Sequence, residues 1–143
     1  MKASVKWVDG MMFLGETGSG HAVVMDGAPE AGGRNHGIRP MEMLLLGLGG
    51  CTSFDVVLIL KRGREPVNGC QVEITAERAD SDPKVFTKIH LDYRLSGKGL
   101  APAKVERAIA LSKEKYCSAS IMLGATADIT TAYSVSEERE LAP

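Results

Sequence analysis

The longest apolar stretch of the chain, residues 41–60, limits the possible folds more than any other feature of the sequence. Pro40 precedes it and suits the first turn of a helix, where its missing N–H group costs nothing. Lys61 and Arg62 follow it, at the end where the helix dipole favours positive charge, and Gly63 comes next as a stop signal. The sequence therefore predicts one long helix from Pro40 to about Arg62.

That helix contains residues that argue against a membrane span. Glu42 and Asp55 lie inside it, and a charge within a bilayer costs a few kcal/mol. Glycines stand at positions 47, 49 and 50, and each weakens a helix by about 1 kcal/mol relative to alanine. They indicate close approach of another helix or backbone, or room for a substrate. We expect a central helix that is buried on nearly all sides.

Length, charge and cysteine content favour an ordinary cytoplasmic protein. The 143 residues predict one domain covering positions 1–143. The N-terminal residues lack the apolar core of a signal peptide, and a net charge of −1 gives no reason to expect nucleic acid or an anionic membrane as partner. Three widely spaced cysteines do not form a disulfide framework and suit a reducing compartment.

The segments before the helix read as short strands. Apolar and polar residues alternate around residues 5–7, and further apolar runs at 12–15 and 22–25 are separated by glycine-rich turns. Residues 26–38 are rich in turn formers and predict a loop whose length is typical of functional or mobile segments. We expect a meander of small strands, then the loop, then the helix.

After the helix, residues 70–79 and 89–95 alternate as the two strands of a long hairpin. A second helix opens at Pro102 and ends near Tyr116; the residues expected on one face of it are Val105, Ala108, Ile109 and Ser112. A short helix over 119–123, capped by Ser118, a last strand over 129–135 and a frayed tail over 137–143 complete the chain. This order predicts an α+β fold.

Two of the three cysteines are candidates for chemistry. Asp55 lies one helical turn from Cys51, where a carboxylate raises the pKa of a thiol, so a nucleophilic Cys51 needs a cation from elsewhere. Cys117 precedes a short helix and follows two lysines, and both features favour a lowered thiol pKa. Inert packing in the core is the alternative for each. Cys70, at the start of a strand, is expected to be structural.

No metal or cofactor site is expected. His21, His36 and His90 share no ligand spacing with the cysteines, and closely paired ligands are absent from the sequence. There is no glycine-rich phosphate loop that enters a helix after a strand. From the residues alone, the sequence indicates two candidate thiols and no specific reaction.

Two motifs resemble the OsmC/Ohr superfamily of osmotically inducible and organic hydroperoxide resistance proteins. The first is the segment Pro-Met-Glu-Met-Leu-Leu-Leu-Gly-Leu-Gly-Gly-Cys at 40–51, with Asp-Val-Val from position 55. The second is Ser-Lys-Glu-Lys-Tyr-Cys at 112–117, where the family places its second cysteine. The resemblance covers nearly the whole chain and is closest to the YhfA-like branch, which shares openings like Val-Lys-Trp-Val at 5–8.

The resemblance implies antiparallel sheets wrapped around central helices in an intertwined homodimer. It also implies a thiol peroxidase that reduces organic hydroperoxides in response to oxidative stress. Carried over to this chain, Cys51 would attack the peroxide and become a sulfenic acid. Cys117 would resolve it as an intrasubunit disulfide, which a dithiol donor then reduces. Apolar surroundings at the dimer interface would favour organic hydroperoxides over hydrogen peroxide.

The chain departs from the family pattern at three positions. Catalytic members place a glutamate directly after the proline that opens the helix, whereas here Met41 follows it and the acid is Glu42. One residue rotates a side chain by about 100° around a helix. Those members also use an arginine beside the thiolate, for which Arg34 and Arg39 are the nearby candidates. Ser118 replaces the proline that usually follows the second cysteine.

A second hypothesis therefore stands beside the peroxidase. In it the protein keeps the fold without the chemistry, and a small apolar ligand occupies a pocket at the dimer interface. Cys51 would then serve packing only. The two hypotheses differ in whether Cys51 reacts with an organic hydroperoxide.

Overall fold

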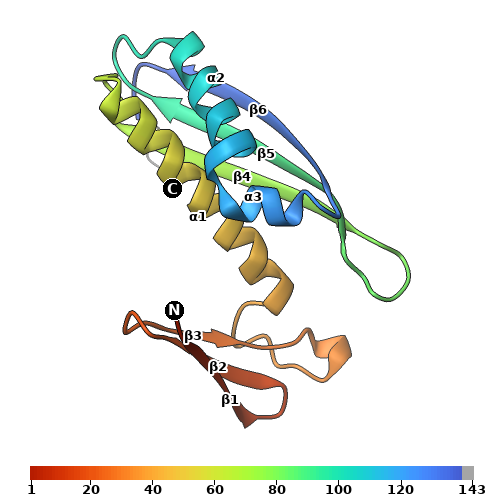
Figure 1. Cartoon of the computed structure of the whole chain (residues 1–143). Helices are drawn as coiled ribbons and strands as arrows, with labels where there is room; N and C mark the ends of the chain where they lie inside the picture. The colour runs from red at the N-terminus through yellow and green to blue at the C-terminus, as the bar shows by residue number, and fades with distance from the viewer. Residues whose placement is uncertain (140–143) are drawn as a thin grey trace. The chain divides into compact units, whose positions relative to one another are not determined.

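Figure 1 shows the computed structural model of the chain, which describes residues 1–139. These residues form two compact units that divide between Leu46 and Gly47. The long helix α1, Pro40–Arg62, begins in the first unit and continues into the second, with the bounds that the sequence predicts. Part of the predicted tail, residues 140–143, lies outside the described residues.

The first unit contains a three-stranded sheet, and this confirms the predicted meander. Strands β1 (Ala3–Asp9), β2 (Met12–Thr17) and β3 (Ala22–Met25) pair antiparallel in chain order. The turn between β1 and β2 contains Gly10 with a φ of 55°, a conformation that favours glycine. A short 3-10 helix, η1 (Pro29–Ala31), follows β3.

The predicted loop of residues 26–38 is organised around one buried carboxylate. Asp26 accepts hydrogen bonds from the backbone N–H groups of Gly27, Arg34 and His36, at 2.7, 3.2 and 3.1 Å. The bond from His36 is the main reason that the pKa of Asp26 is lowered. Met25 and Ile38 also form a β-bridge. The loop is therefore fixed at both ends.

The second unit contains the other sheet, in the order β4-β5-β6. Strands β4 (Gly69–Arg78) and β5 (Phe86–Ser96) form the predicted antiparallel hairpin. Strand β6 (Asp128–Ser136) pairs with β5 in parallel, so the expectation of purely antiparallel sheets is wrong for this sheet. The reason lies in the connection from β5 to β6, because a helical crossover brings the chain back in the same direction.

The helical crossover and α1 cover one face of this sheet (Figure 1). Helix α2 (Pro102–Leu111) is followed by a π-helical turn, η2 (Ser112–Tyr116), and by α3 (Ser118–Leu123). The predicted face of the second helix is confirmed, since its four residues are all buried. The core of this unit consists mainly of apolar side chains: Leu48, Val56, Leu60, Ile89, Leu91, Tyr93, Leu95, Val105, Ala108 and Ile109.

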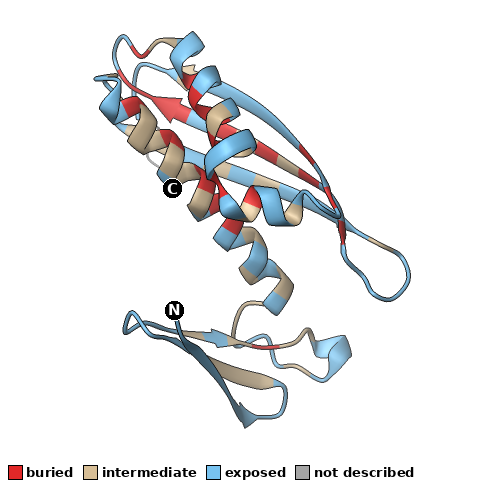
Figure 2. Cartoon of the chain, viewed as in Figure 1, coloured by how far each residue is buried: buried red, intermediate tan, exposed pale blue. Residues whose placement is uncertain are grey.

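The expectation that α1 is buried on nearly all sides is wrong for the single chain. Its buried residues follow one stripe, Leu48, Gly49, Thr52, Val56 and Leu60, because one sheet covers only one face of the helix (Figure 2). The opposite face remains apolar and open. Among residues 1–139, α1 is the one helix whose length and hydropathy would suffice to cross a membrane, and 28% of its apolar window is buried.

Only one of the three glycines in α1 is explained by close approach within the chain. A Cβ atom added at Gly49 would meet Ile74 Cδ1 of β4 at 2.7 Å. Around Gly47 and Gly50 a Cβ atom would meet nothing within 4 Å. The predicted close approach is therefore confirmed at Gly49, whereas the other two glycines face open space.

Candidate functional site

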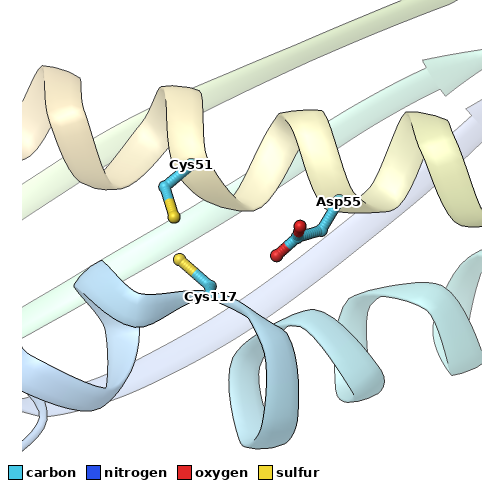
Figure 3. Close-up of side chains that lie close together, drawn as sticks. All are labelled: Cys51, Asp55 and Cys117. Carbon is cyan, nitrogen blue, oxygen red and sulfur yellow. The ribbon is translucent and has the colours of Figure 1, made fainter.

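Two cysteines that are far apart in the sequence meet in the second unit. Cys51 lies in the middle of α1, and Cys117 lies between η2 and α3. Figure 3 shows their sulfur atoms facing each other, with the Asp55 carboxylate turned toward the same space. The two Sγ atoms and a carboxylate oxygen of Asp55 all lie within 4.8 Å of one another. The structure thus brings together the two thiols that the sequence singled out.

The backbone places Cys117 through a change of helical pitch. The end of α2 widens into η2, where the Cys117 N–H group donates to the Ser112 carbonyl oxygen at 2.8 Å. Such π-helical turns occur frequently at functional sites. Cys117 then caps α3 itself, since its Sγ accepts a hydrogen bond from the Ser120 N–H group at 3.4 Å. The prediction that Ser118 caps this helix is therefore wrong by one residue.

The two thiols differ in their exposure. Cys117 is fully buried, whereas Cys51 is half-buried. Burial raises the pKa of the Cys117 thiol; hydrogen bonds from Ser120 oppose the shift and the neighbouring Cys51 adds to it. The predicted lowering of this pKa is therefore wrong. The desolvation of the Cys117 thiol raises its pKa by more than the adjacent helix end lowers it. The Lys115 ammonium group lies over the Tyr116 ring, 5.3 Å from the ring centroid.

A chain of buried hydroxyl groups leads to the third member of the cluster. The Tyr93 and Thr52 hydroxyl oxygens lie 2.7 Å apart, and those of Thr52 and Ser112 lie 2.9 Å apart. Ser112 donates to Asp55 Oδ2 at 3.1 Å. Burial raises the pKa of the Tyr93 phenol to about 12, so it remains a protonated donor at neutral pH.

The sequence patterns did not single out these three hydroxyl residues. A signal was present, because Ser112 stands on the otherwise apolar face of the second helix. Tyr93 lies among aliphatic residues on the inward face of β5, and a buried tyrosine hydroxyl usually has a hydrogen-bond partner. What the sequence could not give was that these groups face one another across three elements.

The third cysteine stands apart from the cluster's hydrogen bonds. Cys70 is half-buried on β4, opposite Leu95 of β5. Burial raises the pKa of its thiol, and a hydrogen bond with Ser53 of α1 opposes the shift. Its structural role stays a prediction.

The candidate arginines and Glu42 have partners within the first unit. Arg34 pairs with Asp9 at 3.1 Å, and Arg39 Nη1 donates to Asn35 Oδ1 at 2.8 Å and to the Gly37 carbonyl oxygen at 3.2 Å. Glu42 Oε1 accepts from the Arg39 backbone N–H group at 2.8 Å, as in one half of a capping box. Their role beside Cys51 stays a prediction.

Metal binding would have to use the same cluster. Among residues 1–139, Cys51, Asp55 and Cys117 are the one set of three thiol, imidazole or carboxylate groups close enough to share an ion. Two thiolates and one carboxylate would suit a soft divalent ion such as Zn²⁺. The close pairing of ligands in the sequence that marks structural zinc sites is absent.

Comparison with known proteins places the chain in a family. Residues 32–132 match the family model described as OsmC-like protein. The chain is 46% identical over 138 residues to Protein YhfA of Escherichia coli strain K12, covering 94% of this chain and 98% of that protein.

Solved structures share the fold. A hypothetical protein from Aquifex aeolicus VF5 is 29% identical with a TM-score of 0.84, covering 96% of this chain and 97% of that one. An organic hydroperoxide resistance protein OsmC from Legionella pneumophila, described as a predicted redox protein, is 15% identical with a TM-score of 0.67. The match covers 96% of this chain and 98% of that one.

Proposed function

Because the chain belongs to the OsmC-like protein family, we propose that it is a cysteine-based peroxidase that reduces organic hydroperoxides. Cys51 attacks the peroxide and becomes a sulfenic acid, and Cys117 resolves it as a disulfide that a small dithiol reduces again. The observation that carries the proposal is the convergence of the two sulfur atoms within 4.8 Å. An S–S bond of about 2.05 Å needs only a modest approach from there.

The difference in exposure supports this division of roles. A peroxidatic thiol must meet its substrate, and Cys51 is the more exposed of the two. A resolving thiol must survive until the sulfenic acid forms, and Cys117 is fully buried with a raised pKa, which keeps it in the less reactive thiol form.

The surroundings of the pair favour an apolar substrate. Ile121 and Met122 stand exposed on α3, the helix that Cys117 caps, and Phe54 stands exposed on α1 one turn from Cys51. Exposed apolar side chains of this kind bind alkyl or aryl groups. Hydrogen peroxide has no alkyl or aryl group, so these apolar side chains do not favour its binding.

A Cys51 thiolate also needs positive charge, since Asp55 stands close to it. We propose that Arg39 or Arg34 supplies it. Arg39 is the better-held candidate, because Asn35 and the Gly37 carbonyl fix its guanidinium group. Glu42 contributes indirectly, by binding the backbone of Arg39.

The substrate class is tested by following peroxide consumption with excess dithiol. We expect cumene hydroperoxide to react at least about 100-fold faster than hydrogen peroxide, the ratio expected from roughly 3 kcal/mol of apolar contact. Equal rates would contradict the role of the apolar surroundings. Absence of turnover in a folded, fully reduced protein would replace the peroxidase proposal by the binding of a small apolar ligand.

We further propose that the protein works as a homodimer, in which a second copy covers the open face of α1. Phe54 is 69% exposed on this face, and Gly47 and Gly50 leave open space beside it. The β4-β5-β6 sheet covers only one face of this apolar helix, and a second copy supplies the missing surface.

Phe54→Glu is expected to separate this dimer. Each dimer contains the change twice, and burial of a phenylalanine side chain is worth roughly 1.5–3 kcal/mol, so the dissociation constant rises at least about 100-fold. Sedimentation at several protein concentrations measures it. Lys61→Glu, a charge change near the end of the same helix, is the matched control. A monomeric wild-type protein at micromolar concentration would contradict the proposal.

A further inference from the structure

The chain of hydroxyl groups beside the two thiols has a direction. An ionised carboxylate only accepts hydrogen bonds, and Ser112 donates its single proton to Asp55 Oδ2 at 3.1 Å in preference to the Thr52 carbonyl oxygen at 3.5 Å. Ser112 must then accept from Thr52, and Thr52 must accept from Tyr93. All three hydroxyl protons therefore point toward Asp55. Such an arrangement holds this carboxylate in a fixed orientation beside the thiols.

Only one of the two Asp55 oxygen atoms is used in this way. Oδ2 receives the hydrogen bond from Ser112, and within residues 1–139 Oδ1 has no hydrogen-bond donor. Figure 3 shows the carboxylate turned toward the space between the two sulfur atoms. One oxygen of this carboxylate lies within 4.8 Å of each sulfur, a distance that a side-chain rotation or a single water molecule closes.

We propose that Asp55 is the proton acceptor for Cys117 when the disulfide closes, and that Tyr93, Thr52 and Ser112 are positioning residues that hold its carboxylate in place. The proposal rests on the function proposed above. It explains the buried hydroxyl network beside the thiols as the support of a proton acceptor.

In the peroxidase cycle, the disulfide closes by one proton transfer followed by a substitution at sulfur. Asp55 takes the proton of the Cys117 thiol, and the thiolate attacks the sulfur of the Cys51 sulfenic acid. The S–S bond forms, the S–O bond breaks, and its electron pair leaves on oxygen. That oxygen takes the proton from Asp55 and departs as water. Cys117 sulfur is oxidised, Cys51 sulfur is reduced, and Asp55 is again a carboxylate.

Neighbouring groups stabilise the negative charge that forms on Cys117 Sγ when its proton is transferred. The Ser120 N–H group donates to its Sγ at 3.4 Å. The Ser120 hydroxyl is buried beside the same sulfur, and its interaction with Cys117 opposes the rise in the pKa of the thiol. The site therefore holds both a proton acceptor and donors for the anion that it creates.

Ellman's reagent isolates this step from peroxide chemistry. It forms a mixed disulfide at the more exposed Cys51 and releases one thionitrobenzoate. Attack by Cys117 then closes the disulfide and releases a second thionitrobenzoate, a leaving group that needs no proton. A Cys70→Ser background removes the third thiol. The first phase reports Cys51, and the second phase reports proton removal from Cys117.

We expect Asp55→Asn to slow the second phase about 100-fold, at the lower end of what a positioned base contributes. The first phase should be unchanged or faster, because a negative charge beside Cys51 is gone. Asp55→Glu should restore part of the second phase, and Ser112→Ala should slow it less than Asp55→Asn does. Asp128→Asn, a change of an exposed carboxylate on β6, is the matched control.

Three outcomes would overturn the proposal. If Asp55 is only a neighbouring charge, Asp55→Asn speeds both phases. If Asp55 only supports the fold, both phases slow together, and the Asp55→Glu protein shows no recovery of the second phase. If wild-type protein shows no second phase, the disulfide step itself is absent. Failure to react with peroxide, with both phases intact, would count against the peroxidase function alone.

Discussion

Cys51→Ser is expected to lower the consumption of cumene hydroperoxide by at least about 1,000-fold, because a serine hydroxyl cannot replace the thiolate as nucleophile. Cys117→Ser should behave differently. The first step remains possible, so the protein loses one thiol rather than two and keeps a sulfenic acid at Cys51. Dimedone, which reacts with sulfenic acids, should label Cys51 in that variant.

The control for this pair is Cys70→Ser. Its thiol lies outside the cluster of Cys51, Asp55 and Cys117, so peroxide consumption and disulfide formation should be unchanged. Rapid turnover by the Cys51→Ser protein would contradict the assignment of the peroxidatic thiol. If Cys51→Ser and Cys117→Ser slowed the loss of the first thiol to the same extent, the division of roles would be contradicted.

Thr52→Val is expected to lower the free energy of unfolding by about 2–4 kcal/mol. Valine has the shape of threonine without its hydroxyl group, and Thr52 stands between Tyr93 and Ser112. The change leaves the buried Tyr93 hydroxyl without its partner, which costs roughly 1–3 kcal/mol, and it removes one hydrogen bond of Ser112, which is worth about 1 kcal/mol. Urea unfolding at a fixed protein concentration measures the effect.

Tyr93→Phe provides the comparison, because it removes the end of the same chain. Thr52 keeps its bond to Ser112, so the expected loss is only about 0.5–1.5 kcal/mol. Thr131→Val, on the exposed strand β6, should change stability by less than about 0.5 kcal/mol. Similar effects of Thr52→Val and Thr131→Val would show that the buried chain contributes little to stability.

Much of the secondary structure could be predicted from local patterns. Pro40 and the cations at residues 61 and 62 set the bounds of α1 because capping preferences act over a few residues. The β4–β5 hairpin followed from the strict alternation of Ile89 and its neighbours. The buried face of α2 followed from the three-and-four spacing that begins at Val105.

What the sequence did not show depends on contacts between distant segments. The parallel pairing of β6 is decided by the crossover, and the open face of α1 by how much of the helix one sheet can cover. The pKa of Cys117 was predicted to fall because Lys113 and Lys115 are near in sequence. It rises because the thiol is buried, and burial is set by elements from the whole unit.

The cluster shows the same division. The sequence singled out Cys51 and Cys117 separately, and it placed Asp55 beside Cys51 by helical spacing. Their meeting within 4.8 Å, and the hydroxyl groups that bind Asp55, arise from packing α1 and η2 against the sheet. Local sequence patterns single out such side chains one at a time, and only the packed structure shows that they lie together.

The most direct test of the central claim is to treat the reduced protein with one equivalent of cumene hydroperoxide, count the free thiols, and map any disulfide by peptide analysis. The account predicts rapid loss of two thiols and a bridge between Cys51 and Cys117. No loss of thiols over minutes in folded protein, or a bridge that includes Cys70, would contradict it.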